Sequence, residues 1–137
     1  MEELVNLIES LDFDEFDYYY HITGKGFGND TMEDGLYLEE PDLKTTMIQL
    51  PEEMLEDPIE YCASEYSNGH VKRQEMVIIG CEKGLGNSII EESDIPKWIG
   101  DQKLNYLVRS ENILGCIDLE TLNITYNPEY IDFNYRR

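Results

Sequence analysis

The spacing of apolar and polar residues predicts a chain built mostly of β-strands, with short helices between them. The continuous apolar run at 75–81 is typical of a buried strand. The aromatic stretch 17–23 has the Tyr, Ile and Thr content of another strand. In 103–110, Leu104 and Val108 fall on the same face of an alternating pattern, which predicts a strand with one buried side.

Weaker patterns complete the expected order of elements. Residues 2–10 place leucines on one face and predict a short amphipathic helix. Prolines and acidic residues within 51–66 indicate two short helical pieces. Residues 89–99 hold a proline and a tryptophan, and we expect an irregular packed stretch there. Further strands are predicted at 45–50, 112–118 and 122–126.

Together these elements indicate the fold class and the domain organisation. Strands dominate and do not alternate regularly with helices, so we expect an α+β fold on mainly antiparallel sheets. The chain of 137 residues has the length of one domain, and no linker or internal repeat divides it. We therefore expect residues 1–137 to form a single domain.

A glycine-rich turn, Gly24-Lys25-Gly26-Phe27-Gly28, follows the strand at 17–23. Such turns can let backbone amides approach a phosphate. The spacing is not the GxGxxG of dinucleotide-binding folds and no long helix follows, so the turn by itself indicates an ordinary loop. A short helix is expected to begin near Asn29 and to end at Gly35.

The charge of the chain restricts its partners. Thirty acidic and ten basic residues give a formal net charge of −20. Such a surface repels nucleic-acid backbones and anionic lipids, so we expect neither direct nucleic-acid binding nor membrane binding. The charge favours solubility, and it also suits docking on a basic protein partner. A non-catalytic acidic interaction protein, acting as a nucleic-acid mimic or inhibitor, is therefore one functional hypothesis.

The three cysteines indicate a cellular compartment rather than a site. Their number is odd and no pair has CxxC spacing, which favours a reducing environment over disulfides or a zinc centre. No apolar run has the length of a membrane span, and the first residues do not have the pattern of a secretory leader. We expect a cytoplasmic protein.

A series of short motifs has a recognisable order along residues 17–126. His21-Ile22-Thr23 ends the first predicted strand, and Gly35-Leu36 follows about fourteen residues after the histidine. A tyrosine-bearing helix is expected next, and the segment 105–115 then supplies two late strands. This order resembles the ADP-ribosyltransferase fold shared by diphtheria-type toxins, poly-ADP-ribose polymerases and RNA 2′-phosphotransferases. The resemblance implies split β-sheets with short helices.

The same resemblance implies a binding site for NAD or a related nucleotide. His21 and Thr23 would hydrogen-bond the adenosine-side ribose or the amide of NAD, with Gly35 in the same motif. Either Tyr61 or Tyr66 would stack on the nicotinamide. From the residues alone, His21 also suits a plain backbone contact at a strand end, and both tyrosines suit core packing.

The resemblance further implies transfer of ADP-ribose to a macromolecular acceptor, or hydrolysis of NAD. The family's catalytic glutamate stabilises a transition state that resembles an oxocarbenium ion, and the matching position here is the neutral Asn105. Glu111 is the nearest acidic candidate downstream. Arg109 is a candidate for contact with a pyrophosphate, or for a surface salt bridge. Catalysis and nucleotide binding without catalysis both stay open at this point.

Overall fold

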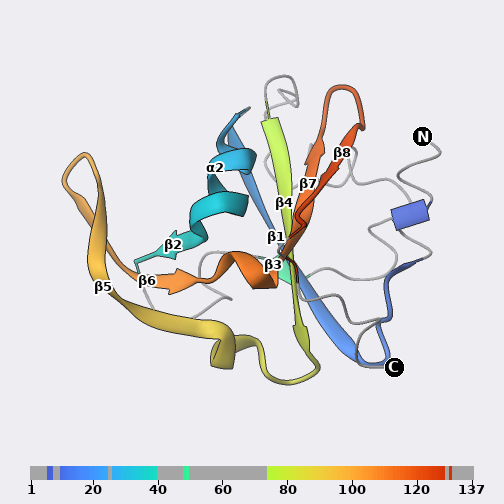
Figure 1. Ribbon diagram of the computed structural model, residues 1–137, viewed down its shortest axis with the longest axis horizontal. Helices are drawn as coiled ribbons and strands as arrows, with labels where there is room; N and C mark the ends of the chain where they lie inside the picture. The colour runs from blue at the N-terminus through green and yellow to red at the C-terminus, as the bar shows by residue number, and fades with distance from the viewer. Residues whose placement is uncertain are drawn as a thin grey trace.

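The computed structural model describes residues 6, 7, 10–24, 26–39, 48–49, 74–128 and 130. Every strand pairing in this part of the chain is antiparallel, so the predicted α+β class with mainly antiparallel sheets is confirmed. The elements, shown in Figure 1, are β1 (Phe16–Gly24), α2 (Phe27–Asp34), β2 (Leu36–Leu38), β3 (Ile48–Gln49), β4 (Gln74–Glu82), the 3-10 helix η2 (Gly86–Ile89), β5 (Ile90–Ile99), β6 (Gln102–Val108), the 3-10 helix η3 (Ser110–Asn112), β7 (Ile113–Asp118) and β8 (Ile124–Tyr126).

Within the described residues the strands form two sheets. The larger sheet has five strands in the order β3-β1-β4-β7-β8, and the smaller has three in the order β2-β6-β5. The chain leaves the larger sheet after β1, forms α2 and β2, and returns to the larger sheet with β3 and then β4. It then adds β5 and β6 to the smaller sheet before β7 and β8 complete the larger one. Helix α2 contacts β1, β4 and β7 and so lies against the larger sheet, beside the smaller one (Figure 1).

Strand β1 contributes to two separate apolar clusters because its side chains alternate between the two faces of the sheet. Tyr18 and Tyr20 are fully buried in a cluster with Leu7, on one face of the larger sheet. Tyr19 points to the other face and packs with residues of the smaller sheet. The run of three tyrosines therefore fills the cores on both sides of β1.

The cluster that contains Tyr19 lies between the two sheets, and we call it the inter-sheet cluster. Leu36 and Leu38 of β2 and Val108 of β6 enter it from the smaller sheet. Met32 enters it from α2. The remaining buried members come from β4 and β7: Val77, Ile79, Cys81, Ile113 and Cys116. Burial of these side chains holds the smaller sheet against the larger one.

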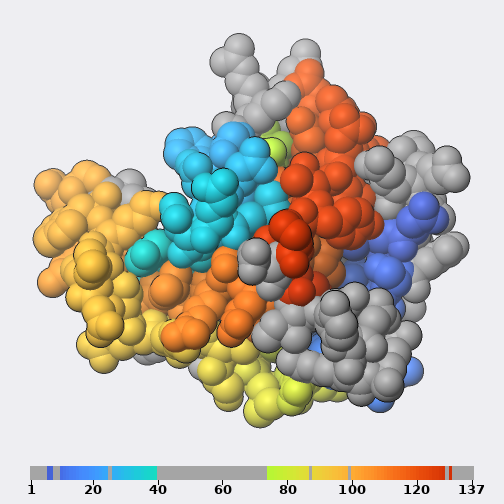
Figure 2. Space-filling view, viewed as in Figure 1, coloured from blue at the N-terminus to red at the C-terminus, as the bar shows by residue number. Residues whose placement is uncertain are grey.

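The stretch 89–99, for which we predicted an irregular packed conformation, is mostly the ten-residue strand β5. Trp98 is not packed but 60% exposed, and Ile95 is 80% exposed. The proline is accommodated because β5 is an edge strand and its pairing with β6 shifts register between Glu92 and Lys97. The β5–β6 hairpin projects from the rest of the molecule in Figure 2.

Most of the other predicted elements agree with the structure where it describes them. The strands at 17–23, 75–81 and 103–110 correspond to β1, β4 and β6, and α2 ends at Gly35 as expected. Asn6, Leu7 and Ser10 are helical. The two helical pieces predicted within 51–66 lie outside the described residues. Among the helices that the structure describes, none has the length and apolar character needed to cross a membrane.

Gly35 makes the turn from α2 into β2 in a conformation that only glycine adopts readily. Its φ is 90° and its ψ is 173°. A Cβ atom added there would lie 2.6 Å from the backbone oxygen of Val108 and 2.6 Å from a side-chain carbon of Leu107. The glycine therefore allows β2 to leave the helix and pair directly with β6.

We expect Gly35→Ala to destabilise the fold by about 3 kcal/mol, because a strained φ is combined with a clash against a strand backbone. Gly84→Ala is the matched control, since Gly84 has a φ of 80° but nothing within 4 Å of an added Cβ atom. That variant should lose only about 1 kcal/mol. Urea unfolding of both variants measures the difference, and equal losses would show that the clash is unimportant.

Candidate functional site

A cavity of about 290 Å³ lies between the end of β1, α2, β2 and the β5–β6 hairpin. Its apolar wall includes Leu36, Leu38 and Leu104. Hydroxyl, amide, imidazole and charged groups supply the rest of the wall. The complete lining is His21, Thr23, Phe27, Asp30, Thr31, Gly35, Leu36, Tyr37, Leu38, Glu39, Lys97, Gln102 and Leu104. An apolar wall with a few polar groups is the usual character of a small-molecule site.

The cavity brings together three of the residues that the motifs predicted. His21 and Thr23 are two positions apart on β1, so both point to the face that also carries Tyr19. Both are partly buried. Ile22, between them, packs in the cluster on the opposite face. Gly35 also lines the cavity, where α2 ends.

Ten of the thirteen residues that line the cavity were not predicted as site residues, and Tyr37, Lys97 and Gln102 are the ones that bear most on its chemistry. Tyr37 directly follows Gly35-Leu36, and this short spacing was the available signal. Lys97 and Gln102 belong to the β5–β6 hairpin, which the sequence pattern did not predict because its proline suggested irregular structure. Their side chains reach a cavity whose other walls are distant in sequence.

Asn105, the residue matched to the catalytic glutamate, is not among the residues that line this cavity. It is partly buried on β6. Its neighbour Leu104 does line the cavity. The resemblance implies that Asn105 and His21 belong to one site, but only His21 lines this cavity.

The remaining predicted site residues lie elsewhere or outside the described part. Glu111, in η3, lines a separate cavity of about 130 Å³ together with Cys81. Arg109 is exposed, and its Nε lies 2.6 Å from Oε2 of Glu91. This hydrogen bond raises the pKa of Arg109 above its usual range, so the residue makes the surface salt bridge considered above. Tyr61 and Tyr66 lie outside the described residues.

The charged groups of the main cavity are of both signs. Asp30 and Glu39 bring carboxylates, and Lys97 brings an ammonium group. Nε2 of Gln102 donates a hydrogen bond of 2.7 Å to Oε2 of Glu39, which ties the hairpin to the residue after β2. The Lys97 ammonium lies 5.3 Å from the centre of the Tyr37 ring, a cation–π contact.

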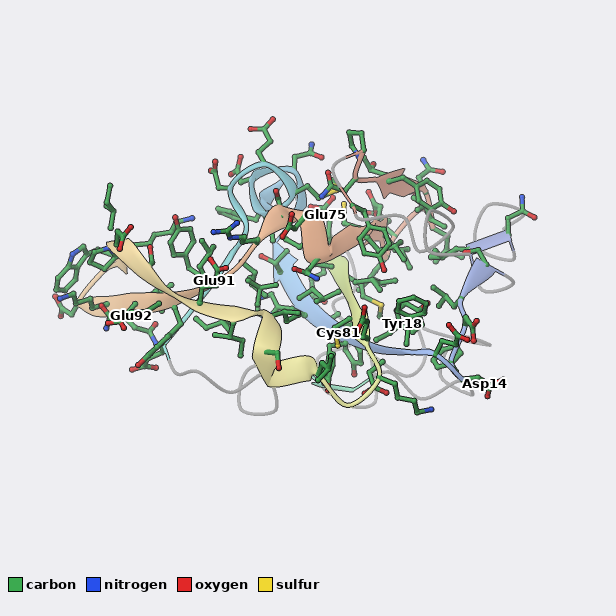
Figure 3. All side chains as sticks on the ribbon, turned by 60° about the horizontal axis from the view of Figure 1, so that its bottom comes forward. Asp14, Tyr18, Glu75, Cys81, Glu91 and Glu92 are labelled. Atoms are coloured by element: carbon green, nitrogen blue, oxygen red, sulfur yellow. The ribbon has the colours of Figure 1, made fainter. Side chains whose placement is uncertain are left out.

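The glycine-rich turn is occupied by a carboxylate of the chain itself. The backbone N–H groups of Gly26 and Gly28 donate to Oε1 of Glu75 at 2.8 and 3.2 Å. Gly26 precedes α2, so Glu75 satisfies free amides at the start of this helix (Figure 3). These amides hold a side chain of β4 in this structure and are not presented to the cavity.

The two described cysteines are buried and have high pKa values. Burial and, to a smaller extent, the nearby carboxylates of Asp17 and Glu82 together raise the pKa of Cys81 to about 11. Burial likewise raises the pKa of Cys116 to about 11, with Glu75 and Asp118 adding to the effect. Neither thiol has the environment of an activated nucleophile.

Comparison with known proteins found no matching family model, no matching curated protein and no matching solved structure. Among the described residues, no group of three or more His, Cys, Asp or Glu side chains is arranged to hold a metal ion. The chemistry of the main cavity therefore has to be inferred from its own residues.

We expect Glu75→Ala to lower the free energy of unfolding by about 1–2 kcal/mol, because two amides at the start of α2 lose their acceptor. Glu92→Ala is the matched control, since it removes the same charge from an exposed position on β5. Thermal or urea unfolding compares the two variants. A loss of equal size in both would mean that net charge, and not the contact with the turn, is responsible.

We expect both described thiols to stay unreactive toward a disulfide reagent at pH 8 in the folded protein. A pKa of about 11 leaves roughly one thiol in a thousand ionised at that pH, and burial blocks access as well. Cys62→Ser removes the third thiol, which lies outside the described residues. In this variant, both thiols should react once denaturant is added. Rapid reaction without denaturant would contradict the assignment.

Proposed function

We propose that this chain is a small ADP-ribosyltransferase-like protein that binds NAD or a related nucleotide in the cavity between β1, α2, β2 and the β5–β6 hairpin. The observation that carries the proposal is the meeting of His21 and Thr23 with the Gly35-Leu36 turn around one cavity. These are the residues that the motif order predicted. They come from two different sheets, and only the fold brings them together.

The chemistry of the cavity wall supports a nucleotide as ligand. The imidazole of His21 and the hydroxyl of Thr23 can hydrogen-bond a ribose or an amide. Phe27 lines the cavity and is 61% exposed, so its ring offers apolar surface for a base. We assign the stacking role to Tyr37, in place of the tyrosines expected on a later helix, because Tyr37 lines the cavity and its ring lies beside Lys97 of the same wall.

The residues of the cavity suit nucleotide binding better than they suit ADP-ribose transfer. Transfer of ADP-ribose needs a carboxylate near the positive charge that develops on the ribose. Asn105 is neutral and does not line the cavity, and Glu111 lines a different one. Asp30 and Glu39 are the carboxylates of the described cavity wall. We therefore propose nucleotide recognition as the function of this site, with transfer to a macromolecule or NAD hydrolysis as activities to be assayed separately.

The net charge of −20 supports a second candidate function, that of an acidic protein that docks on a basic partner. Such docking is electrostatic and should weaken strongly as the salt concentration rises. It requires no nucleotide. Binding to a basic protein that disappears in salt, together with no affinity for any nucleotide, would favour this second function.

Calorimetric titration with NAD tests the first proposal. We expect the parent protein to bind, and we expect Thr23→Val to weaken binding about two- to twelve-fold, because one hydrogen bond of about 0.5–1.5 kcal/mol net is lost. His21→Ala should weaken binding by a similar factor. Thr125→Val is the matched control, since Thr125 is an exposed strand residue of β8 outside the cavity.

Two results would overturn the assignment of this cavity. The first is an absence of NAD binding by the parent protein, tested together with ADP-ribose and nicotinamide mononucleotide. The second is binding that Thr23→Val and Thr125→Val leave equally unchanged. Unfolding curves of each variant show whether a loss of binding reflects the site or the stability of the fold.

A further inference from the structure

The cavity has few groups that could hold an anion. Of the thirteen residues that line it, Lys97 is the one that carries a full positive charge at neutral pH. Asp30 and Glu39 carry negative charge, and the chain as a whole has a formal charge of −20. A phosphate would be repelled from such a cavity unless a cation stood beside it.

The irregularity in β5 determines that a lysine occupies this position. Glu92 pairs with Tyr106, and in an unbroken antiparallel ladder Asp94 would then pair with Leu104. The register shift instead places Lys97 opposite Leu104. Paired residues of neighbouring strands share a face, and Leu104 lines the cavity. The bulge thus replaces an acidic residue by a basic one on the cavity wall.

The Lys97 ammonium is available for a ligand. Within the described part of the chain it forms no salt bridge, and its contact is with the Tyr37 ring at 5.3 Å. An exposed cation–π contact contributes only about 0.5–1 kcal/mol, so an ammonium group can leave it for a phosphate. The nearby carboxylate of Glu39 accepts instead from Gln102.

We propose that Lys97 is the phosphate-binding residue of this cavity, and that the site selects phosphorylated nucleotides over nucleosides. This inference rests on the proposed function, because it names a chemical class for the ligand of the same cavity. It adds a role for the β5–β6 hairpin, whose bulge brings the lysine to the site. A lysine contacts phosphate as a point charge, and salt should therefore weaken the interaction.

The chain offers a matched control on the same hairpin. Lys103 pairs with Trp98, and its ammonium lies 5.8 Å from the centre of the Trp98 ring. It does not line the cavity. Lys97→Met and Lys103→Met each remove one positive charge and one cation–π contact from the hairpin. They differ in whether the lysine faces the cavity.

The experiment is calorimetric titration of the parent protein and both variants with nicotinamide mononucleotide and nicotinamide riboside, which differ by one phosphate. We expect Lys97→Met to weaken binding of the mononucleotide roughly five-fold and to leave binding of the riboside within about two-fold. Lys103→Met should leave both unchanged. Added salt should reduce the preference of the parent protein for the mononucleotide and should have little effect on Lys97→Met.

Three results would overturn the role of Lys97 while the proposed function stands. These are equal losses in the two variants, equal losses for the mononucleotide and the riboside, and no loss in Lys97→Met. If the parent protein binds no nucleotide, the proposed function fails, and titration with inorganic pyrophosphate decides the inference. Pyrophosphate binding that Lys97→Met abolishes and Lys103→Met retains would keep Lys97 as an anion site. If the parent protein binds neither a nucleotide nor pyrophosphate, the proposed function and the role of Lys97 are both overturned.

Discussion

The inter-sheet cluster is the interaction on which the rest of this structure depends. A three-stranded sheet with one apolar face cannot stay folded in water unless another element covers that face. Here Leu36, Leu38 and Val108 are buried against β4 and β7 of the larger sheet. This burial keeps β2 and the β5–β6 hairpin next to the end of β1. The position of the cavity follows from it.

The cavity begins where this cluster ends. On β1 the same face carries Tyr19 in the cluster and then His21 and Thr23 at the cavity. On β6, Val108 lies in the cluster and Leu104, four residues earlier, lies at the cavity. Each strand thus passes from a packed apolar part to a part that faces a hollow. A site built in this way is held by rigid strands, which favours recognition of a ligand of defined shape.

The arrangement of charge is a second constraint on what the site can do. A strongly acidic chain needs a specific reason to accept an anionic ligand. The amides of the glycine-rich turn do not supply one, because Glu75 occupies them. The bulge in β5 brings Lys97 to the cavity wall instead. The groups at the site, and not the fold alone, therefore decide which ligand the cavity can take, since one fold can carry many functions.

The sequence by itself determined β1, β4 and β6, because the apolar patterns that mark these strands are local and strong. It also determined that His21 and Thr23 lie on the same face of their strand, since side chains two positions apart in a strand share a face. Only the tertiary structure decided which residues meet them. Pro96 is typical of irregular structure, so the sequence did not predict β5, the strand that carries Lys97. The register of β5 against β6 also cannot be derived from either strand alone. The same holds for Asn105, whose facing depends on how β6 packs and not on its place in a motif.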